Sequence, residues 1–436
     1  MAPALDIRTV WHAFLPLALS WMLMAADSPI CTRIAFWLPN GEVNTAAILA
    51  LFSISILIES PVIDLLSTGT ALTRSREAYA ALARFSLILM AFSGLVHALV
   101  ALTPLYDVVA VQWIGLRPEV AETARIPLAL MIPWSPAIGW RRFQQGVLIR
   151  QGQSRAVGYG TLVRLVALLL MGVGLAMTKS VSGAFATACA LSFSVTAECL
   201  AVHLLARPAV RSLPEGGAAP SMSSLLRFHL PLTGATVFQL MGFAAMVPAL
   251  SRMPDPVFAL ATWQALGAVS FFAQTVTFAL PEVVITYADR TGSWAVLSRF
   301  CLLVGGGLTL VVLLLVVTGA NQWLFREVLQ ATPRVAEAAA MGLAALAFIP
   351  LVRASGNLLR GYLTAAGITV ARLVATFAGS GVLVALLFLG VALNWTGPKT
   401  AVVAVLGSTV AELIALAWLW RRNRDTAMKT LQVAST

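Results

Sequence analysis

The sequence is poor in charge. Of its 436 residues, 29 are Lys or Arg and 18 are Asp or Glu, so that only 11% are charged, whereas 59% are hydrophobic. A soluble protein of this length needs many more charged residues to cover its surface. Long apolar runs recur throughout, and about 20 apolar residues in a helix cross the hydrocarbon core of a bilayer. The sequence therefore predicts an all-α polytopic membrane protein with the lipid bilayer as its surroundings.

Motifs for nucleotide hydrolysis and for metal binding are missing. There is no GxxxxGK[ST] loop, no HExxH pair and no Asp-rich metal motif. The four cysteines have no CxxC spacing and the four histidines are isolated, which indicates structural roles for both. We therefore predict that the protein is not an enzyme, and we expect no catalytic residue, no metal and no cofactor.

The apolar runs predict twelve transmembrane helices with both termini on one side. The expected spans are 9–37, 42–72, 80–105, 122–149, 156–178, 181–206, 225–252, 257–287, 294–319, 334–362, 366–393 and 399–421. Sixteen Lys and Arg residues then lie on the side of the termini and eight on the other. Because cytoplasmic loops are enriched in Lys and Arg, we expect cytoplasmic termini and a bacterial inner (plasma) membrane. The net charge of +11 is thus a topology signal and does not indicate nucleic-acid binding.

Short sequence matches recur in order at nearly one offset, which indicates an internal duplication. They are FLPL at 14–17 and HLPL at 229–232, RF at 84–85 and 299–300, IP at 132–133 and 349–350, RLVA at 164–167 and 372–375, and AECLA at 197–201 and AELIA at 411–415.

Six helices in each copy give the copies the same orientation, and parallel repeats with a central site between them are a recurring transporter plan. The predicted domains are an N-terminal six-helix lobe (1–206), a cytoplasmic linker rich in Pro, Gly and Ser (207–224), and a C-terminal six-helix lobe with a short basic tail (225–436). We expect two bundles around a central cavity, in a monomer.

Charged residues inside the spans point to pairing or to function, because an unpaired charge in the membrane costs several kcal/mol. Arg164 and Glu198 are expected at similar depth in adjacent antiparallel helices, and Arg372 with Glu412 repeats this arrangement. We predict two structural ion pairs within contact distance.

The fourth helix of each half carries basic residues with no such local partner. GWRRFQQG at 139–146 holds Arg141 and Arg142, and RASGNLLRG at 353–361 places Arg353 and Asn357 one turn apart. Guanidinium groups bind carboxylate and phosphate oxygens. We predict that these residues bind substrate where the two helices face the cavity. For Arg142 and Arg360, snorkelling of the side chain toward the interface is at least an equal alternative.

The stretch ILIESPVID at 56–64 places two carboxylates in the second span. Glu59 is expected to line the cavity, and Asp64, nearer the cytoplasm, is expected to pair with an Arg and close that side. Glu282 follows Pro281 at the corresponding place in the other half, and Asp27 lies deep in the first span. We predict coupling or gating roles for these four carboxylates.

Several longer stretches resemble a known family. They are FLPLALSWMLMAADSPICTR at 14–33, SPVIDLLSTGTALTRSREAY at 60–79, and RASGNLLRGYLTAAG with ARLVA at 353–375. They are similar to the progressive ankylosis protein (ANK) family, within the multidrug/oligosaccharidyl-lipid/polysaccharide (MOP) exporter superfamily. The resemblance implies a MATE-like fold and export of a small anionic metabolite, such as pyrophosphate, a nucleotide or a citrate-like carboxylate, by alternating access. It also directs attention to Gln239, which stands where the family implies basic residues, as a substrate-binding residue.

Other functions stay open at this point. A proton- or sodium-coupled antiporter of cationic drugs would place the carboxylates in its cavity, whereas an anion exporter would place the arginines there. A flippase of lipid-linked precursors, or a membrane-embedded receptor without transport, is a further alternative.

Overall fold

The computed structural model describes residues 5–366 and 368–434, and nearly all of them are helical, with no strand in these ranges. The first half of the chain holds α1 (Ile7–Ala25), α2 (Asp27–Trp37), α3 (Gly41–Ile63), α4 (Leu65–Leu72), α5 (Arg76–Leu102), α6 (Leu105–Asp107), η1 (Val108–Trp113), α7 (Pro118–Leu130), α8 (Trp134–Arg150), α9 (Ser154–Thr178) and α10 (Gly183–Arg211). The second half holds α11 (Met222–Ala244), α12 (Met246–Leu250), α13 (Pro256–Gln274), η2 (Thr275–Ala279), α14 (Leu280–Tyr287), α15 (Ser293–Val317), α16 (Ala320–Trp323), η3 (Leu324–Val328), α17 (Pro333–Ala345), α18 (Ile349–Ala365), α19 (Thr369–Ala392) and α20 (Gly397–Ala434).

The element order repeats between the halves. The pair α7 and α8 recurs as α17 and α18, with equal lengths of 13 and 17 residues. Trp134 and Ile349, which begin α8 and α18, are separated by the same offset as the FLPL and HLPL matches. The regular element order thus follows the predicted duplication.

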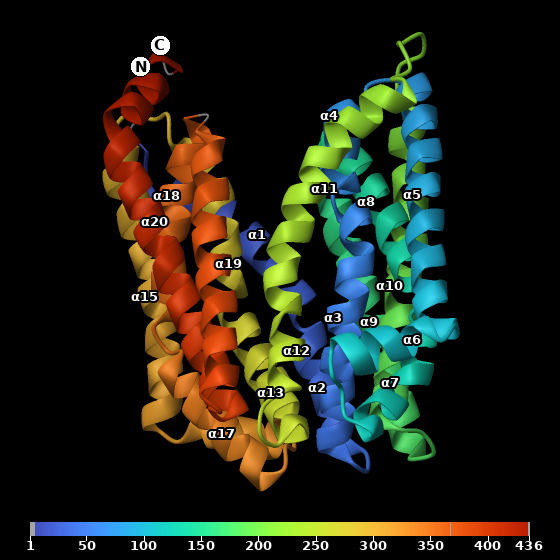
Figure 1. Cartoon of the computed structure of the whole chain (residues 1–436). Coiled ribbons are helices and arrows are strands. Elements are labelled where there is room, and N and C mark those ends of the chain that lie inside the picture. Colours follow the sequence, from blue (N-terminus) through green and yellow to red (C-terminus); the bar gives the residue numbers. More distant parts are fainter. Residues whose placement is uncertain (1–4, 367, 435–436) are drawn as a thin grey trace. The chain divides into compact units, whose positions relative to one another are not determined.

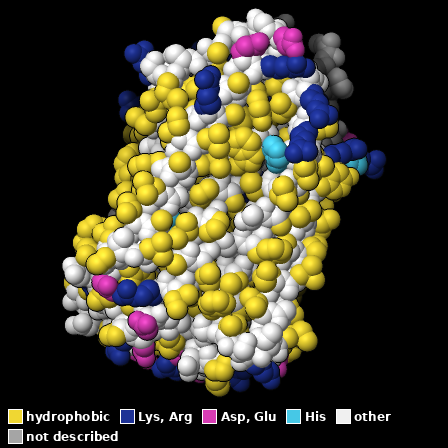
Figure 2. All heavy atoms as spheres, turned by 90° about the vertical axis from the view of Figure 1, so that its right-hand side faces the viewer, with side chains coloured by type: hydrophobic (Ala, Val, Ile, Leu, Met, Phe, Trp, Pro, Cys, Tyr) yellow, Lys and Arg dark blue, Asp and Glu magenta, His cyan; other side chains and the backbone are white. Residues whose placement is uncertain are grey.

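Each predicted span is built from helix. Ten helical segments are long and apolar enough to cross a membrane, and α17 with α18 forms an eleventh, bent by 44°. The remaining predicted span, 122–149, consists of α7 and α8, and α8 carries two adjacent arginines and two glutamines near its middle. In Figure 2, hydrophobic side chains cover the middle of the visible face and charged side chains gather toward its two ends. These features are those of an integral membrane protein.

The chain folds into two units, which we describe separately. Unit 1 comprises residues 1–29, 253–255 and 262–436, and unit 2 comprises residues 30–252 and 256–261. In unit 1, α1 packs against η2, α14 and α15; in unit 2, α11 packs along α3, as Figure 1 also shows.

These units differ from the predicted lobes, since α1 belongs with the second half and α11 with the first. Composition places the boundary at the polar linker but does not show against which bundle an apolar helix packs.

Two predicted boundaries also differ from those in the structure. The predicted linker starts at 207, but α10 continues through Pro208 to Arg211. The following loop is tied to α5: Glu77 accepts hydrogen bonds from the amides of Gly216 (3.0 Å) and Gly217 (3.1 Å). The predicted basic tail is part of α20, which ends at Ala434.

The second span of the chain is interrupted at Asp64, between α3 and α4 of unit 2. Pro61 cannot donate a backbone hydrogen bond to the preceding turn. The hydroxyl of Ser60 donates instead to the carbonyl oxygen of Leu57, at 2.7 Å. The break therefore leaves polar backbone groups of this span available to other partners.

Two glycines at equivalent positions permit the close approach of the second and fourth helices of each repeat. A Cβ on Gly146 of α8 would lie 2.5 Å from the carbonyl oxygen of Leu66 in α4, and a Cβ on Gly361 of α18 would lie 2.6 Å from Val284 in α14. Gly361 follows Gly146 at the offset that separates Trp134 and Ile349. The duplication has kept a helix contact that only glycine permits.

Replacement of Gly146 by Ala is expected to destabilise the protein, because the obstructing atoms are backbone and one helix must move. We expect about 1–3 kcal/mol, the usual cost of overpacking, measured as a lower midpoint of thermal unfolding in detergent. Gly158→Ala on α9 is the control, since its Cβ would meet nothing within 4 Å. Equal midpoints for both variants would show that the contact is not close.

Candidate functional site

The centre of unit 2 holds a buried carboxylate, Glu198 of α10, surrounded by cationic and amide groups. Arg141 of α8 forms an ion pair with it, and both side chains are buried, at 3% and 0% exposed. Gln145 donates its Nε2–H to Oε1 of Glu198 over 3.4 Å, and Nη1 of Arg164 on α9 lies 3.8 Å from Oε2. One carboxylate is thus shared between two guanidinium groups and an amide.

The packing of α8 explains why these groups meet. In unit 2, α8 contacts α3, α4, α5, α9 and α10. Arg141 and Gln145 are four residues apart, so they lie on the same face of α8, toward α10. Arg164 approaches from α9, where its guanidinium also lies over the ring of Trp134, 5.7 Å from the centroid.

A second buried carboxylate extends this arrangement. Glu59 of α3 is 8% exposed and accepts a hydrogen bond from Nε1–H of Trp134. Trp134 thereby stands between Glu59 and Arg164. We call the whole set the Glu198 cluster: Glu59, Trp134, Arg141, Arg142, Gln145, Arg164 and Glu198.

The Glu198 cluster has more positive than negative charge. It contains three guanidinium groups and two carboxylates. Arg142 is in direct contact with neither carboxylate, because the groups that contact them belong to other residues. Nε of Arg142 is buried and has no hydrogen-bond partner among the described residues. Arg142 interacts with Glu59 and Glu198 only through longer-range electrostatics. Because a guanidinium stays charged at any physiological pH, this surplus charge favours an anion nearby.

Unit 1 contains the equivalent arrangement, which we call the Glu412 cluster: Arg353, Asn357, Arg360 and Glu412. Arg360 of α18 forms an ion pair with Glu412 of α20 and donates to Oδ1 of Asn357 at 2.9 Å. Asn357 in turn donates to the carbonyl oxygen of Thr277 at 2.8 Å. Nε of Arg353 is buried without a hydrogen-bond partner among the described residues.

The two clusters occupy matching positions in the repeat. Glu198 and Glu412 are the glutamates of the matching stretches AECLA and AELIA, and Arg360 follows Gln145 at the offset that separates Gly146 and Gly361. Their burial differs, because Glu412 is 22% exposed and Glu198 is 0% exposed. In each unit the sixth helix of the repeat supplies the carboxylate and an arginine of the fourth helix neutralises it. A second guanidinium of the fourth helix, that of Arg142 or Arg353, forms no ion pair among the described residues.

The structure changes the interpretation of Arg141. The sequence suggests a free substrate-binding residue, whereas the structure binds Arg141 to Glu198. The predicted pair of Arg164 with Glu198 is present at 3.8 Å, but Arg141 is the closer partner because α8 packs directly against α10. In unit 1, Arg360 forms an ion pair with Glu412. The side chains of Arg372 and Gln239 lie outside the described residues, so the predicted pair of Arg372 with Glu412 stays a prediction.

The carboxylates predicted to act in coupling or gating differ in their exposure. Asp27 is buried at the start of α2, whereas the side chain of Glu282 on α14 is exposed. Asp64 forms no ion pair with an arginine in the part of the chain that the structure describes, so the predicted gate pair is absent there. Arg141 and Arg353 lie in different units, and their predicted meeting across a cavity stays a prediction.

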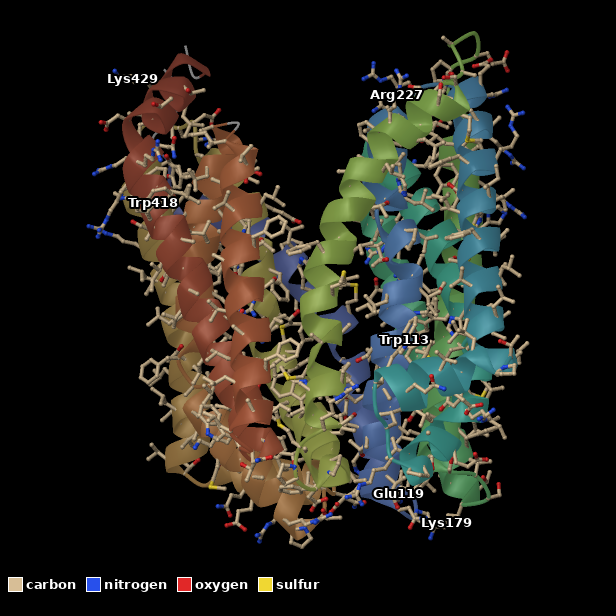
Figure 3. The ribbon with its side chains drawn as sticks, in the orientation of Figure 1. Trp113, Glu119, Lys179, Arg227, Trp418 and Lys429 are labelled. Carbon is tan, nitrogen blue, oxygen red and sulfur yellow. The ribbon has the colours of Figure 1, made fainter. Side chains whose placement is uncertain are left out.

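Trp134, Gln145 and Arg360 are site residues that the sequence prediction missed. Gln145 and Arg360 share one position of the repeat, on the two fourth helices, and that shared position is the signal that points to them. Among the described residues, no group of three or more His, Cys, Asp or Glu side chains is placed to hold a metal ion. Figure 3 shows that the labelled charged residues Glu119, Lys179, Arg227 and Lys429 lie toward the ends of the helices.

The fold matches solved transporter structures over nearly its whole length. An inward-facing MATE family multidrug-resistance transporter of the MOP superfamily aligns with a TM-score of 0.67 and 15% identity, covering 92% of this chain and 95% of the other. A MOP superfamily transporter from Pyrococcus furiosus aligns at 0.60 and 15%, covering 96% of each chain. The lipid II flippase MurJ aligns at 0.65 and 10%, covering 96% and 90%. No family model and no curated protein matches the sequence. The chain therefore has the MATE-like fold of these solved transporters, as the sequence predicts.

Proposed function

We propose that the protein is a membrane transporter that moves small anionic metabolites by alternating access. The observation that carries this proposal is the surplus guanidinium in each unit, Arg142 and Arg353, which form no ion pair among the described residues. The Nε of both is buried without a hydrogen-bond partner there, as is the Nε of the ion-paired arginines of the two clusters. Burying such a charge is costly unless an anion or water neutralises it. A carboxylate or phosphate oxygen supplies both the charge and the acceptor that a guanidinium needs.

The bonding of the carboxylates favours an anion over a cationic drug. Glu59 accepts a hydrogen bond from Trp134, and Glu198 and Glu412 are ion-paired with arginines. A cation would have to displace these partners, whereas an anion meets unsatisfied donors. The solved structure from Pyrococcus furiosus is described as having a binding pocket of reversed polarity, which suggests a different function for that transporter.

The finer assignment follows the sequence resemblance. We propose an ANK-like exporter of pyrophosphate, a nucleotide or a citrate-like carboxylate, acting as a monomer in the bacterial inner membrane with cytoplasmic termini. Arg142, Arg353 and Asn357 are the proposed substrate-binding residues. A lipid-linked precursor carries phosphate groups as well, and the match to the lipid II flippase makes it the second candidate.

Uptake into proteoliposomes tests the proposed function. We expect the purified full-length protein to move at least one of radiolabelled citrate, ATP and pyrophosphate faster than protein-free liposomes do. A cationic dye, with and without a pH gradient, is measured in parallel. Movement of the dye alone would overturn the proposal and favour a cation antiporter. Movement of a fluorescent lipid-linked phosphate alone would favour a flippase.

A further inference from the structure

The outer side of α20 in unit 1 changes its chemical character along the helix. Val410, Ile414 and Trp418 are 44%, 63% and 55% exposed, and Arg422 is exposed as well. These four residues follow one another at intervals of four, so they lie on the same side of the helix. One exposed face of a membrane helix thus passes from aliphatic side chains through an indole to a guanidinium.

Packing on the opposite side of α20 fixes the rotation of the helix. Trp420 is buried, and its ring stacks on that of Trp294 of α15, with the centroids 4.9 Å apart and the planes inclined by 5°. The ring of Tyr362 on α18 lies 5.6 Å from that of Trp420. Because these contacts hold one side of α20 against the bundle, Trp418 and Arg422 are held on the side that faces away from it.

Aromatic and cationic side chains pair near both ends of the membrane-spanning part of α20. Cζ of Arg422 lies 5.6 Å from the ring centroid of Trp418, and Nζ of Lys399 lies 4.6 Å from that of Trp395, just before the helix. Lys399 and Arg422 are 23 residues apart, which is about 35 Å along a helix, whereas the hydrocarbon core is about 30 Å thick. Since Trp rings and the charged ends of long side chains collect at the two interfaces, we expect Arg422 at the level of the lipid headgroups.

The segment of α20 that follows this level is basic. Asp425 is the only acidic residue of the sequence after Trp418. Figure 3 shows Trp418 and Lys429 in turn toward the C-terminal end of α20. Four exposed cations of this segment form no ion pair among the described residues: Arg421, Arg422, Arg424 and Lys429. This end of the helix therefore suits a negatively charged partner.

The equivalent helix of the first repeat lacks the indole and the arginine one turn after it. The match of AECLA with AELIA places Leu204 and Pro208 of α10 at the positions of Trp418 and Arg422. Leu204 is exposed as Trp418 is, so an aliphatic side chain serves at this place in unit 2. The exposed indole and its arginine are therefore not a requirement of the shared fold, which favours a role specific to this face of unit 1.

We propose that the outer face of α20 at Trp418 and Arg422 binds the headgroup of an anionic phospholipid. The guanidinium of Arg422 binds the phosphate oxygens, and the ring of Trp418 orients that guanidinium. Arg421 adds positive charge beside it. Val410 and Ile414, on the same face, lie where the acyl chains of that lipid pack. A soluble phosphate would meet the cations but would gain nothing from this aliphatic strip, so a lipid is the occupant that fits both parts of the face.

This inference goes beyond the proposed transport. It depends neither on transport nor on the side of the membrane on which the termini lie. Each basic residue near an anionic lipid surface contributes about 1 kcal/mol, which is about fivefold in affinity.

Native mass spectrometry of the full-length protein in detergent tests the site, because it counts bound lipids and gives the dissociation constant of the first one. Phosphatidylglycerol and phosphatidylcholine with the same acyl chains are compared, since only the former has a net negative charge. We expect phosphatidylglycerol to bind at least about fivefold more tightly. In Arg422→Gln, its dissociation constant is expected to rise about fivefold.

Arg207→Gln is the matched control, because it removes one exposed arginine from the same end of the equivalent helix α10. It is expected to leave the first lipid bound as tightly as before. Trp418→Leu, which copies the leucine of the first repeat, is expected to weaken phosphatidylglycerol binding about two- to fivefold, the usual effect of an exposed cation–π contact.

Three results would overturn the proposal. The first is equal affinity for the two lipids, and the second is an equal loss of affinity in Arg422→Gln and Arg207→Gln. The third is displacement of the lipid by an equal concentration of glycerol 3-phosphate, which has no acyl chain and would identify a site for a soluble phosphate. None of these results depends on whether the protein moves an anion.

Discussion

Replacement of Arg142 by Gln is expected to slow anion uptake by about thirtyfold or more while the protein stays folded. Arg142 is the guanidinium of the Glu198 cluster that makes no direct contact with either carboxylate. Loss of a buried charged contact to a ligand typically costs about 2–5 kcal/mol, and every ~1.4 kcal/mol is tenfold in affinity. Initial rates of radiolabelled anion uptake into proteoliposomes measure the effect.

Two further variants make this result specific. Arg353→Gln removes the corresponding guanidinium of the Glu412 cluster and is expected to slow uptake to a similar degree. Arg155→Gln on α9 is the control, because this side chain is exposed and its loss removes only surface charge. Uptake that is unchanged in Arg142→Gln would show that Arg142 only extends toward the interface, the alternative that the sequence leaves open.

Replacement of Glu198 by Ala is expected to destabilise the protein by about 3–5 kcal/mol, the usual cost of breaking a buried ion pair. The change leaves Arg141 and Arg164 buried without their carboxylate, and neither guanidinium can lose its charge. The midpoint of thermal unfolding in detergent, read by tryptophan fluorescence, measures the loss. The double replacement Arg141→Met with Glu198→Met is expected to recover only part of it, because it removes the closer charge pair but leaves Arg164 without Glu198.

The duplicated site provides the control for this prediction. Glu412→Ala breaks the equivalent ion pair with Arg360. In this pair the side chain of Arg360 is 21% exposed and that of Glu412 is 22% exposed. A partly exposed pair contributes about 1 kcal/mol or less, so the midpoint is expected to fall much less than in Glu198→Ala. Equal losses in the two variants would show that burial does not distinguish the two clusters.

The two repeats have therefore diverged around a shared plan. Gln145 of α8 occupies the repeat position that Arg360 occupies on α18. The glutamate is neutralised by Arg141 in unit 2 and by Arg360 in unit 1. In both units one guanidinium is left over, but it lies on a different turn of the helix. This divergence explains why matching single residues between the halves misses the closer ion pairs, those of Arg141 with Glu198 and of Arg360 with Glu412.

The class of protein and the repeat were determined by the sequence itself. A scarcity of charge together with long apolar runs has one stable solution, helices that satisfy their own backbone in the bilayer. The short sequence matches at one nearly constant offset predict the recurrence of α7 and α8 as α17 and α18. Such features depend on residues close together in the chain or on simple counts.

Partner choice was decided only by the tertiary structure. Arg141, Arg142, Arg164 and Glu198 are all deep charges by the sequence, but which guanidinium meets the carboxylate depends on the rotation of α8 and α9 against α10. The placement of α11 beside α3 brings His229 to Pro61 and Thr68 from a distant part of the sequence. An apolar helix can pack against many surfaces at similar gain, because the membrane solvates all of its sides equally well. Its actual neighbours follow from the small and polar side chains that fit, and those fits appear only when the whole bundle is assembled.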